Sequence, residues 1–575
     1  MKDRVSNDIG AKGTGQQWAD INWKLIQKRV KNLRQRIYRA TQQHQWNRVR
    51  SLMKLMLRSQ ANLLLSIKRV TQINRGKETA GVDGLTFRST EEREWLWRTM
   101  QIYTPWIAKP ARRVYIPKAN GKQRPLGIPT VQDRVLQAVV KNALEPSWEA
   151  RFEANSFGFR PGRSVHDAIT QCHSRLRKGH DLWVLDADIK GAFDHISHRY
   201  ILDAIGAIPG RELIKQWLKA GYVESDVFYE TPNGVPQGGV ISPLLANIAL
   251  DGLGAMLDKH RKVSPRTPLP SAKGSTYQRK LPKYGFIRYA DDFVVTARSQ
   301  EDLEAVLPEI QAWLQQRGLQ LNPEKTQIVP VTKGFNFLGF TIRHFNGHCI
   351  IRPQKDKVLA FLNDIRSWLK RHKDIKQVDV IRYLNPKLKG WCNFYRHVAS
   401  KRVFSYVEYQ IWKALWRWSY KRHRNKGRRW VAKKYFHTLR GRSWIFATKA
   451  QDRDGKEHTF ALTQVYDTPI NRHIRVKGTF SPDDPTLSDY WRKRRTGMGK
   501  VLLARGSKLH HVAQSQRWKC QVCGEHLFNG ETLQTHHKQP VKEGGGDDLL
   551  NLELIHKACH NHRHVHGRRL EPDDG

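Results

Sequence analysis

Carboxylates at the ends of two apolar runs are the residues of this chain best suited to chemistry. Asp291 and Asp292 stand side by side at a turn within the otherwise apolar segment 286–296, and Asp188 follows an apolar run that begins at Trp183. Two-metal phosphoryl transfer needs carboxylates from different elements around ions roughly 3.5–4 Å apart. The three acids therefore predict such a metal site, although an Asp-Asp pair taken alone is also common turn chemistry.

Two further segments have residues suited to binding a phosphorylated ligand. Residues 112–125 are predicted to form a hairpin whose Lys118 and Arg124 could grip a triphosphate through charge-assisted hydrogen bonds. A solvated basic turn is the alternative. Residues 233–243 combine glycines with a proline in an apolar segment, which lets the backbone approach a ligand closely, and they lead into a helix predicted over 244–250.

Paired cysteines and histidines near the C-terminus have the spacing of a metal site. Cys520 and Cys523 are separated by two residues, and His556 and Cys559 repeat that gap. Four nitrogen and sulfur ligands in two such pairs suit a closed tetrahedral zinc site. A redox or disulfide pair is the alternative, which an intracellular compartment disfavours. The remaining cysteines are predicted to be small buried hydrophobes: Cys172, Cys349 and Cys392.

Histidines also gather in the same C-terminal segment. His560 and His564 are four residues apart, so on a helix they face the same way. Together with a histidine from the preceding strand they could converge on one ion.

The charge of the chain indicates an anionic partner. The sequence has 101 Lys and Arg against 52 Asp and Glu, a formal net charge of +49 over 575 residues. Such a surface predicts sequence-independent binding to phosphate that weakens steeply with salt. No apolar run approaches the roughly 18–20 residues needed to span a bilayer, and residues 1–8 lack the apolar core of a signal peptide. We therefore expect a cytoplasmic protein without a membrane partner.

The length allows several domains, each with its own core. Apolar residues recur at helical spacing in 23–38 and 46–70, which predicts an N-terminal helical extension, and the Pro-, Ser- and Lys-rich stretch 262–283 predicts an exposed insertion. Residues 381–440 contain 17 Lys and Arg against a single acid, Glu408. At least half of the aromatics in that stretch should lie in the core of a helical bundle: Trp391, Tyr395, Trp412, Trp416, Trp418 and Trp430.

Seven sequence blocks, taken in order, resemble the finger and palm motifs of reverse transcriptases, most closely those of the group II intron-encoded proteins. They are 81–84, 156–162, the strand with Asp188, 236–239, 289–292, 321–326 and 337–340. Residues 390–395 resemble the maturase motif of that family, and the C-terminal histidines resemble the ββα-metal, or HNH, endonuclease motif. The resemblance covers nearly the whole chain.

The resemblance implies an α+β multidomain fold. Its parts are an N-terminal helical extension (1–80), right-hand-like fingers and palm (81–350), an α-helical thumb or maturase X domain (351–450), a DNA-binding region (451–510) and a small zinc-stapled ββα-metal domain (511–575). A basic linker is the alternative for 451–510, where Arg472, His473, Arg475 and Lys477 precede the basic run 490–495.

The family implies roles for single residues of the polymerase. Asp188, Asp291 and Asp292 would ligate two Mg²⁺, with Asp292 the weakest candidate as a direct ligand. Phe193 would lie under the sugar and exclude a 2′-hydroxyl. Lys325 would donate a proton to pyrophosphate or, alternatively, satisfy a carbonyl at a helix end. The remaining contacts to the triphosphate, nucleotide and template would come from Arg112, Lys118, Arg124 and Gln237.

The HNH resemblance implies a second active site. His537 would activate water as general base, Asn551 would orient that water, and a Mg²⁺-type cation would be held by His536, His560 and His564. Lys538 stands where the family often has an apolar residue, a departure that bears on cleavage more than on fold. A zinc-stapled DNA-binding module without cleavage is the alternative.

Together these resemblances imply an RNA-directed DNA polymerase that also acts as splicing maturase and site-specific DNA endonuclease. Intron RNA, target DNA, template–primer and dNTPs would be its partners, in the cytoplasm of a prokaryotic-type cell and on the nucleoid when bound to DNA. The alternatives are an RNA-binding maturase that no longer copies RNA, against which the complete acid set argues, and a domesticated reverse transcriptase, which the attached HNH motif disfavours.

Overall fold

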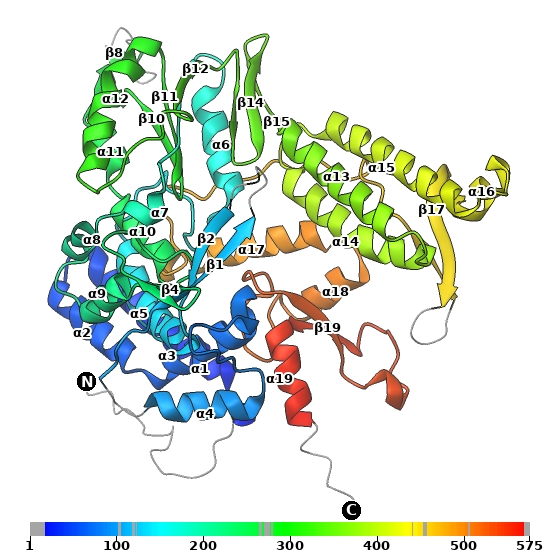
Figure 1. Ribbon diagram of the computed structural model, residues 1–575, viewed down its shortest axis with the longest axis horizontal. Helices are drawn as coiled ribbons and strands as arrows, with labels where there is room; N and C mark the ends of the chain where they lie inside the picture. Colours follow the sequence, from blue (N-terminus) through cyan, green and yellow to red (C-terminus); the bar gives the residue numbers. More distant parts are fainter. Residues whose placement is uncertain are drawn as a thin grey trace, which may run out of the picture.

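A computed structural model describes residues 18–101, 105–117, 121, 123–263, 267–268, 276–277, 280–439, 441–451, 457–503 and 506–567 (Figure 1). Side chains are described throughout these ranges except in 262–280, at 542 and in 564–567. Lys118 therefore lies outside the described residues, as do the side chain of His564 and most of the expected insertion at 262–283. Among the helices described, none is both long and apolar enough to cross a membrane.

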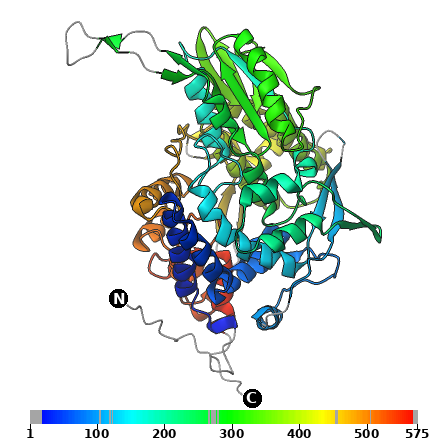
Figure 2. The same ribbon diagram turned by 90° about the vertical axis from the view of Figure 1, so that its left-hand side faces the viewer.

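The N-terminal part is a layer of helices, as the helical spacing predicted. Helices α1 (Trp23–Gln42), α2 (Trp46–Leu57) and α3 (Gln60–Lys68) pack on the central helix α5 (Val131–Glu149). The side chain of Ser59 accepts a hydrogen bond from the Asn62 amide, a cap that fixes the start of α3. Helix α4 (Thr90–Gln101) lies at the edge of this layer (Figures 1 and 2).

A four-stranded sheet carries the predicted hairpin. Its strands, in the order β2-β1-β4-β5, are β1 (Ala111–Pro117), β2 (Gln123–Ile128), β4 (Tyr222–Glu224) and β5 (Val227–Tyr229). Arg112 pairs with Ile128 and Ile116 with Arg124. Because side chains alternate across a strand, Arg112 and Arg124 lie on one face of the hairpin and Arg113 on the other.

The second sheet brings the acids together. Its order is β10-β11-β3-β12, from β3 (Trp183–Ala187), β10 (Gly285–Tyr289), β11 (Asp292–Ala297) and β12 (Gln327–Pro330). Val184 and Val294 pack in the same core as helix α6 (Val165–Leu176), whereas Leu185 and Val295 pack in the core of α12 (Gln300–Gln315). This alternation places Asp186, Asp188 and Asp292 on the α6 face of the sheet.

A small antiparallel sheet leads from this unit into a helical bundle. Strands β13 (Phe335–Phe337), β14 (Phe340–Phe345) and β15 (His348–Pro353) precede α13 (Lys355–Arg371), α14 (Gln377–Tyr395), α15 (Lys401–Arg422) and α16 (Arg428–Tyr435). The sheet β16 (Phe436–Leu439), β17 (Arg442–Gln451) and β18 (Glu457–Ala461) follows. The prediction for the aromatics is confirmed: Tyr395 and Trp418 are buried, and Trp391, Trp412 and Trp416 are half-buried against the same core.

The C-terminal part folds back onto the N-terminal helices. After an irregular stretch come α17 (Ser488–Leu502), α18 (Lys508–Ser515), the hairpin β19 (Leu533–His537) and β20 (Leu552–His556), and α19 (Lys557–Gly567). Helix α19 (red) lies beside the start of the N-terminal layer (blue) in Figure 1, and the rings of Trp23 and His562 are 5.9 Å apart. The two ends of the described chain thus share one hydrophobic core.

Shorter elements complete the connections. They are α7 (Ala192–His195), α8 (His198–Ile205), α9 (Arg211–Lys219), α10 (Ser242–Ala249), α11 (Leu253–Leu257), β6 (Arg261–Val263), β7 (Thr267–Pro268), β8 (Thr276–Tyr277), β9 (Lys280–Pro282), the π-helical turn Arg69–Ile73 and the 3-10 turns Trp18–Asp20, Arg75–Glu78, Pro485–Leu487 and Val541–Glu543. Helix α10 confirms the one predicted after the glycine-rich loop.

Candidate active sites

The predicted acids meet where β3 ends and β11 begins. The last residue pair between these strands is Ala187–Phe293. Asp188 and Asp292 are the adjoining residues at that edge of the sheet, and Asp291 lies in the turn beside them. Oδ2 of Asp188 accepts hydrogen bonds from the Lys325 ammonium at 2.8 Å and from the Asn322 amide at 3.3 Å.

The proximity of these carboxylates raises the pKa values of Asp291 and Asp292. Loss of bulk solvation, together with the charges of Asp291, Asp188 and Asp186, raises the pKa of Asp292 to about 7. Burial and the charge of Asp188 likewise raise the pKa of Asp291. Carboxylates that repel one another in this way are stabilised by a hard divalent cation with oxygen ligands. The donor set therefore fits Mg²⁺-type ions.

Asp186 belongs to the same cluster, although sequence reasoning did not single it out. Burial and the charge of Asp188 raise its pKa to about 6. Its position two residues before Asp188 on one strand was the signal that could have found it, since such residues face the same way.

A buried network holds the turn with the paired acids from behind. Ala290 has a φ of +60°, a left-handed conformation, and a Cβ added to Gly158 would lie 2.2 Å from the Ala290 nitrogen. The buried Arg288 donates from Nη1 to Asn247 Oδ1 and to the Ala290 carbonyl, both at 3.0 Å. Asn247 in turn donates to the Gly158 carbonyl at 2.8 Å. The segment around Gly158 thus positions the turn.

The residues expected to contact a nucleotide fall into two groups. The positive charge of Arg124 acts to lower the pKa of Asp291, and Arg112 lies on the same face of the hairpin. Phe193 and Gln237 instead line a cavity of about 430 Å³ under the opposite face.

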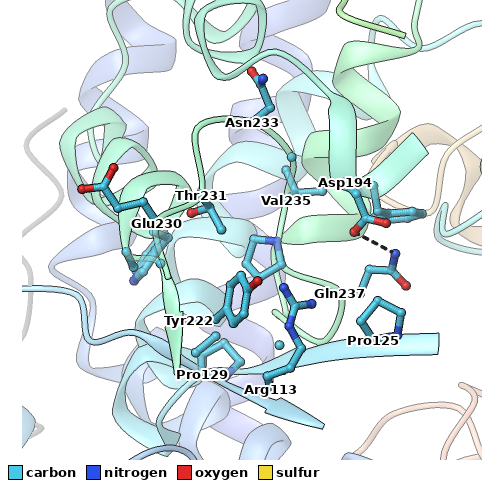
Figure 3. Close-up of a pocket in the computed structure, with 18 of the residues that line it drawn as sticks. Arg113, Pro125, Pro129, Asp194, Tyr222, Glu230, Thr231, Asn233, Val235 and Gln237 are labelled. Atoms are coloured by element: carbon cyan, nitrogen blue, oxygen red, sulfur yellow. Dashed lines mark hydrogen bonds between the residues drawn. The ribbon is translucent and has the colours of Figure 1, made fainter. Parts of the chain in front are cut away.

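Figure 3 shows that cavity, in which Gln237 donates to Asp194 Oδ1 at 3.3 Å. The Arg113 guanidinium lies 3.7 Å from the centre of the Tyr222 ring on its wall. Arg113 is a lining residue that the sequence prediction did not include. Its alternation with Arg112 along β1 was the available signal.

The four predicted zinc ligands converge in the C-terminal part. One ligand atom from each of Cys520, Cys523, His556 and Cys559 lies within 4.8 Å of the others, and all four residues are buried. Nε2 of His556 lies 3.2 Å from the Leu527 carbonyl, which leaves Nδ1 directed toward Cys523 Sγ at 3.4 Å. Soft sulfur ligands with an imidazole oriented by a carbonyl fit a structural zinc ion.

A buried lysine from the N-terminal layer contacts this cluster. Nζ of Lys68 lies 3.6 Å from Cys559 Sγ and 4.2 Å from the centre of the Trp23 ring. Three thiolates and a neutral imidazole around a divalent ion have a net charge of −1, which the Lys68 ammonium offsets.

The histidines of the second predicted site lie on the β19–β20 hairpin and on α19. The rings of His536 and His560 are 5.3 Å apart. Nδ1 of His536 lies 3.3 Å from Glu553 Oε1, and Arg563 also contacts that carboxylate. Glu553 is thus a charged neighbour that the sequence prediction omitted; the register of the hairpin pairs it with His536.

The side chains of His537 and Asn551 make different contacts. Nε2 of His537 lies 2.7 Å from Asp547 Oδ1. The carboxamide of Asn551 accepts from the Gln539 amide at 2.7 Å and donates to the carbonyls of Gln539 and Gly546. Asn551 therefore braces the loop that joins the two strands, next to His537.

Four family profiles match successive parts of the chain. They are described as the N-terminal domain of reverse transcriptase (residues 18–100), reverse transcriptase, RNA-dependent DNA polymerase (116–342), the maturase-specific domain of group II introns (358–436) and HNH endonuclease (520–566).

Curated relatives agree with these matches. The chain is 37% identical over 319 residues to Protein YkfC of Escherichia coli (strain K12), an alignment that spans 51% of this chain and 82% of that protein. It is 29% identical over 581 residues to the group II intron-encoded protein LtrA of Lactococcus lactis subsp. cremoris, which spans 86% of this chain and 92% of that protein. Among solved structures, a Candida albicans telomerase complex gives a TM-score of only 0.32 at 12% identity, with 59% of this chain and 64% of that chain covered.

The fold and its acids thus define a reverse transcriptase with an attached HNH nuclease. The chain belongs to the group II intron-encoded proteins: it is a multifunctional RNA-directed DNA polymerase with maturase and endonuclease domains.

Proposed function

We propose that this protein supports the mobility of a group II intron by target-primed reverse transcription and that it also acts as a maturase in splicing of the intron RNA. The HNH domain would nick one strand of target DNA, and the freed 3′-hydroxyl would prime cDNA synthesis on the intron RNA. The convergence of Asp188, Asp291 and Asp292 at the ends of adjacent strands is the observation that supports copying most directly.

Asp188 and Asp291 would hold the catalytic cations of the polymerase, with Asp292 completing the charge of the site. Two divalent cations bound there would align the 3′-hydroxyl with the α-phosphate and stabilise the charge that develops on the attacking and leaving oxygens. Arg112 and Arg124 lie on the same face of the hairpin, and the charge of Arg124 acts on Asp291. Both arginines would hold the triphosphate oxygens through charge-assisted hydrogen bonds. Lys118 belongs to the same proposal, as a contact outside the described residues.

Phe193 and Gln237 would control which nucleotide is accepted. The ring of Phe193 packs edge-to-face on Phe159 at 6.2 Å, a contact that restricts its movement. A ring held in this way would clash with a 2′-hydroxyl and so favour deoxynucleotides. Gln237, next to it in the cavity, would contact the nucleotide or template.

In the nuclease, His537 would take a proton from the attacking water, and Asp547 at 2.7 Å would stabilise the resulting imidazolium. His536, His560 and His564 would hold the cation at the scissile phosphate. Asn551 would contribute by fixing the loop next to His537.

Zinc is the proposed occupant of the Cys520, Cys523, His556 and Cys559 cluster, and its role there would be structural. The cluster joins the end of β20 and the start of α19 to the turn that contains Cys520 and Cys523, so the bound ion would set the position of the HNH hairpin.

Intron RNA and DNA would bind on different parts of the chain. The basic bundle of residues 351–450 is proposed to grip intron RNA and template–primer, and residues 451–510 are proposed to contact target DNA, between the palm (81–350) and the HNH domain (511–575). The N-terminal helices (1–80) would complete the fingers. The excess of Lys and Arg over these surfaces supports phosphate binding.

Variants that each disable one of the two active sites test this proposal. The assay uses a ribonucleoprotein of the full chain and intron RNA with labelled duplex target, either intact or already nicked. His537→Ala should leave the intact target uncut and still extend the nicked one, whereas Asp291→Ala should cut the intact target and make no cDNA. Splicing of precursor RNA should persist in both variants.

Two results would contradict the proposal. Failure of the unaltered protein to extend even the nicked target would favour the maturase that only binds RNA. Cleavage by the His537→Ala variant at the original rate would show that the histidine hairpin is a DNA-binding module without a catalytic role.

A further inference from the structure

Three histidines outside both candidate active sites converge at the junction of the palm, the bundle and the segment that follows. His166 lies at the start of α6, His397 lies just after α14, and His473 lies in the irregular stretch before α17. One ring nitrogen from each lies within 4.8 Å of the others. The ring centroids are 4.5 Å apart for His166 and His397, and 5.5 Å for each of these with His473.

Each of these imidazoles is oriented by an acceptor that has no proton of its own. Nε2 of His166 lies 2.7 Å from the Phe394 carbonyl, and Nδ1 of His397 lies 2.7 Å from the Asn471 carbonyl. Nε2 of His473 lies 3.0 Å from Asp167 Oδ1. The backbone carbonyls fix Nε2 of His166 and Nδ1 of His397 as N–H donors and leave a lone pair on the other nitrogen of each ring. Nε2 of His473 lies between an acceptor, Asp167, and a donor, Arg494 Nη2 at 3.2 Å, so its neighbours allow either tautomer.

This arrangement is the one that metal-ligating histidines have in proteins. Such a histidine donates its second N–H to a carbonyl or carboxylate, which fixes its tautomer and orientation. Two of the three rings are fixed in this way by backbone carbonyls, and the third, His473, contacts the Asp167 carboxylate.

A buried carboxylate offsets part of the positive charge around the cluster. Arg494 brings a positive charge close to His473, with Nη2 at 3.2 Å from Nε2. The buried carboxylate of Asp167 accepts from that same guanidinium at 3.0 Å and from the Val476 amide at 2.8 Å. Asp167 thus offsets the charge of Arg494 beside His473.

A cavity gives solutes a route to the cluster. His397 and His473 line a cavity of about 750 Å³, whose wall also includes His173 and Cys349. A metal ion can enter from this side, and a water molecule from the cavity can supply a fourth ligand.

We propose that His166, His397 and His473 form a second transition-metal site, distinct from the cysteine cluster, that binds a Zn²⁺-type ion through three imidazole nitrogens and one water. Imidazole ligands suit ions of this class, whereas Mg²⁺ prefers oxygen. The bound ion would fasten the end of α14 and the segment around His473 to α6, and so fix the bundle against the palm.

Cobalt binding by the full-length protein tests the proposal. The protein, with His560→Asn to disable the nuclease site, is stripped with chelator and titrated with Co²⁺ in excess Mg²⁺. Cobalt at the cysteine cluster is marked by a thiolate charge-transfer band, and a tetrahedral three-histidine site gives visible absorption without that band. We expect two tightly bound Co²⁺ per chain.

Conservative variants identify the second ion. His473→Gln and His397→Asn keep a donor toward Asp167 and the Asn471 carbonyl, respectively, but lack the second ring nitrogen. Each variant should bind one Co²⁺ instead of two, with the thiolate band unchanged. The second Co²⁺ equivalent should raise the Tm of the parent protein but not the Tm of either variant. His173→Gln, in the same cavity, should still bind two.

The unchanged thiolate band also reports that the variants are folded. Uptake of a single, thiolate-bound Co²⁺ by the parent protein would overturn the proposal. So would two bound ions in both His473→Gln and His397→Asn, because the second ion would then lie elsewhere.

Discussion

The ammonium of Lys325 lies 2.8 Å from Oδ2 of Asp188, in the position where a cation bound to the acid cluster would compete with it. The hydrogen bond to Asp188 raises the pKa of Lys325, so the side chain stays charged through the neutral range. The structure thus gives this lysine a carboxylate partner, not the helix-end carbonyl that sequence reasoning offered as the alternative.

This contact predicts that Lys325→Gln lowers the Mg²⁺ concentration needed for half-maximal primer extension. Removal of the competing ammonium should shift the midpoint of the Mg²⁺ titration down several-fold, whatever happens to the maximal rate if Lys325 also donates a proton. The exposed Lys190 provides a matched control, and Lys190→Gln should leave the midpoint unchanged. A midpoint that rises in Lys325→Gln would contradict the competition.

The turn with the paired acids should depend on Gly158. A methyl group there would lie 2.2 Å from the Ala290 nitrogen, so Gly158→Ala must displace the turn. Overpacking of this kind typically costs about 1–3 kcal/mol. We expect primer extension to fall at least tenfold while DNA cleavage persists. Gly497→Ala on α17, where an added Cβ meets nothing within 4 Å, should extend primers normally. Equal activity of the two variants would refute the role of Gly158.

A buried ion-pair network joins the N-terminal layer to the segment before α17. Arg34 donates to Glu145 at 2.9 Å and to Asp483 at 2.7 Å. Burial alone would raise the pKa of Glu145, but the charges of Lys141 and Arg34 lower it to about 2. Arg34→Met should lower the free energy of unfolding by about 3–5 kcal/mol at neutral pH, because it leaves the buried Asp483 carboxylate unpaired and Glu145 with Lys141 alone.

The pH dependence of that loss has a definite sign. The pKa of Glu145 in the folded protein, about 2, lies below its ordinary value of 4.5, so the stabilisation is present above pH 4.5 and disappears as the pH falls toward 2. Denaturant titrations of Arg34→Met should therefore show a deficit that is largest above about pH 5 and shrinks on acidification. Arg199→Met breaks an exposed pair with Asp203 and should change stability by less than about 1 kcal/mol at any pH. A deficit that grows on acidification would exclude this explanation.

Lys68 should strengthen metal retention at the cysteine cluster. Lys68→Met removes the buried charge 3.6 Å from Cys559 Sγ, and partners of this kind typically contribute 10–100-fold to metal affinity. Competition with a chromophoric chelator should show a loss of about tenfold or more. Lys24→Met, an exposed lysine beside Gly524, should retain the ion as the parent does. Unchanged affinity in Lys68→Met would mean that the −1 charge is offset elsewhere.

The sequence was informative where chemistry requires particular residue types at short spacing. Asp291 and Asp292, and the pairs of cysteine and histidine around Cys520, could be identified because their spacing is local. Alternation along β1 could also have separated Arg112 from Arg113. The N-terminal helices followed from periodicity for the same reason.

Contacts between distant segments could not be predicted from the sequence. Lys68 and Cys559 are 491 residues apart, and Arg34 and Asp483 are 449 apart. His166, His397 and His473 are each an isolated histidine in their own segment, with no periodic pattern to mark them. Only the packing of α6 against the bundle and the following segment brings the three rings together.

Primer extension on an RNA template with Mg²⁺ and dNTPs tests most directly whether the acid cluster copies RNA into DNA. The Asp291→Asn variant should lose at least about 100-fold in rate. It should remain folded and be at least as stable without metal, because burial and Asp188 already disfavour the charged form of Asp291. Asp203→Asn, an exposed carboxylate on α8, should extend primers like the parent. Extension by Asp291→Asn at the parental rate, or none by the parent protein, would contradict that role of the cluster.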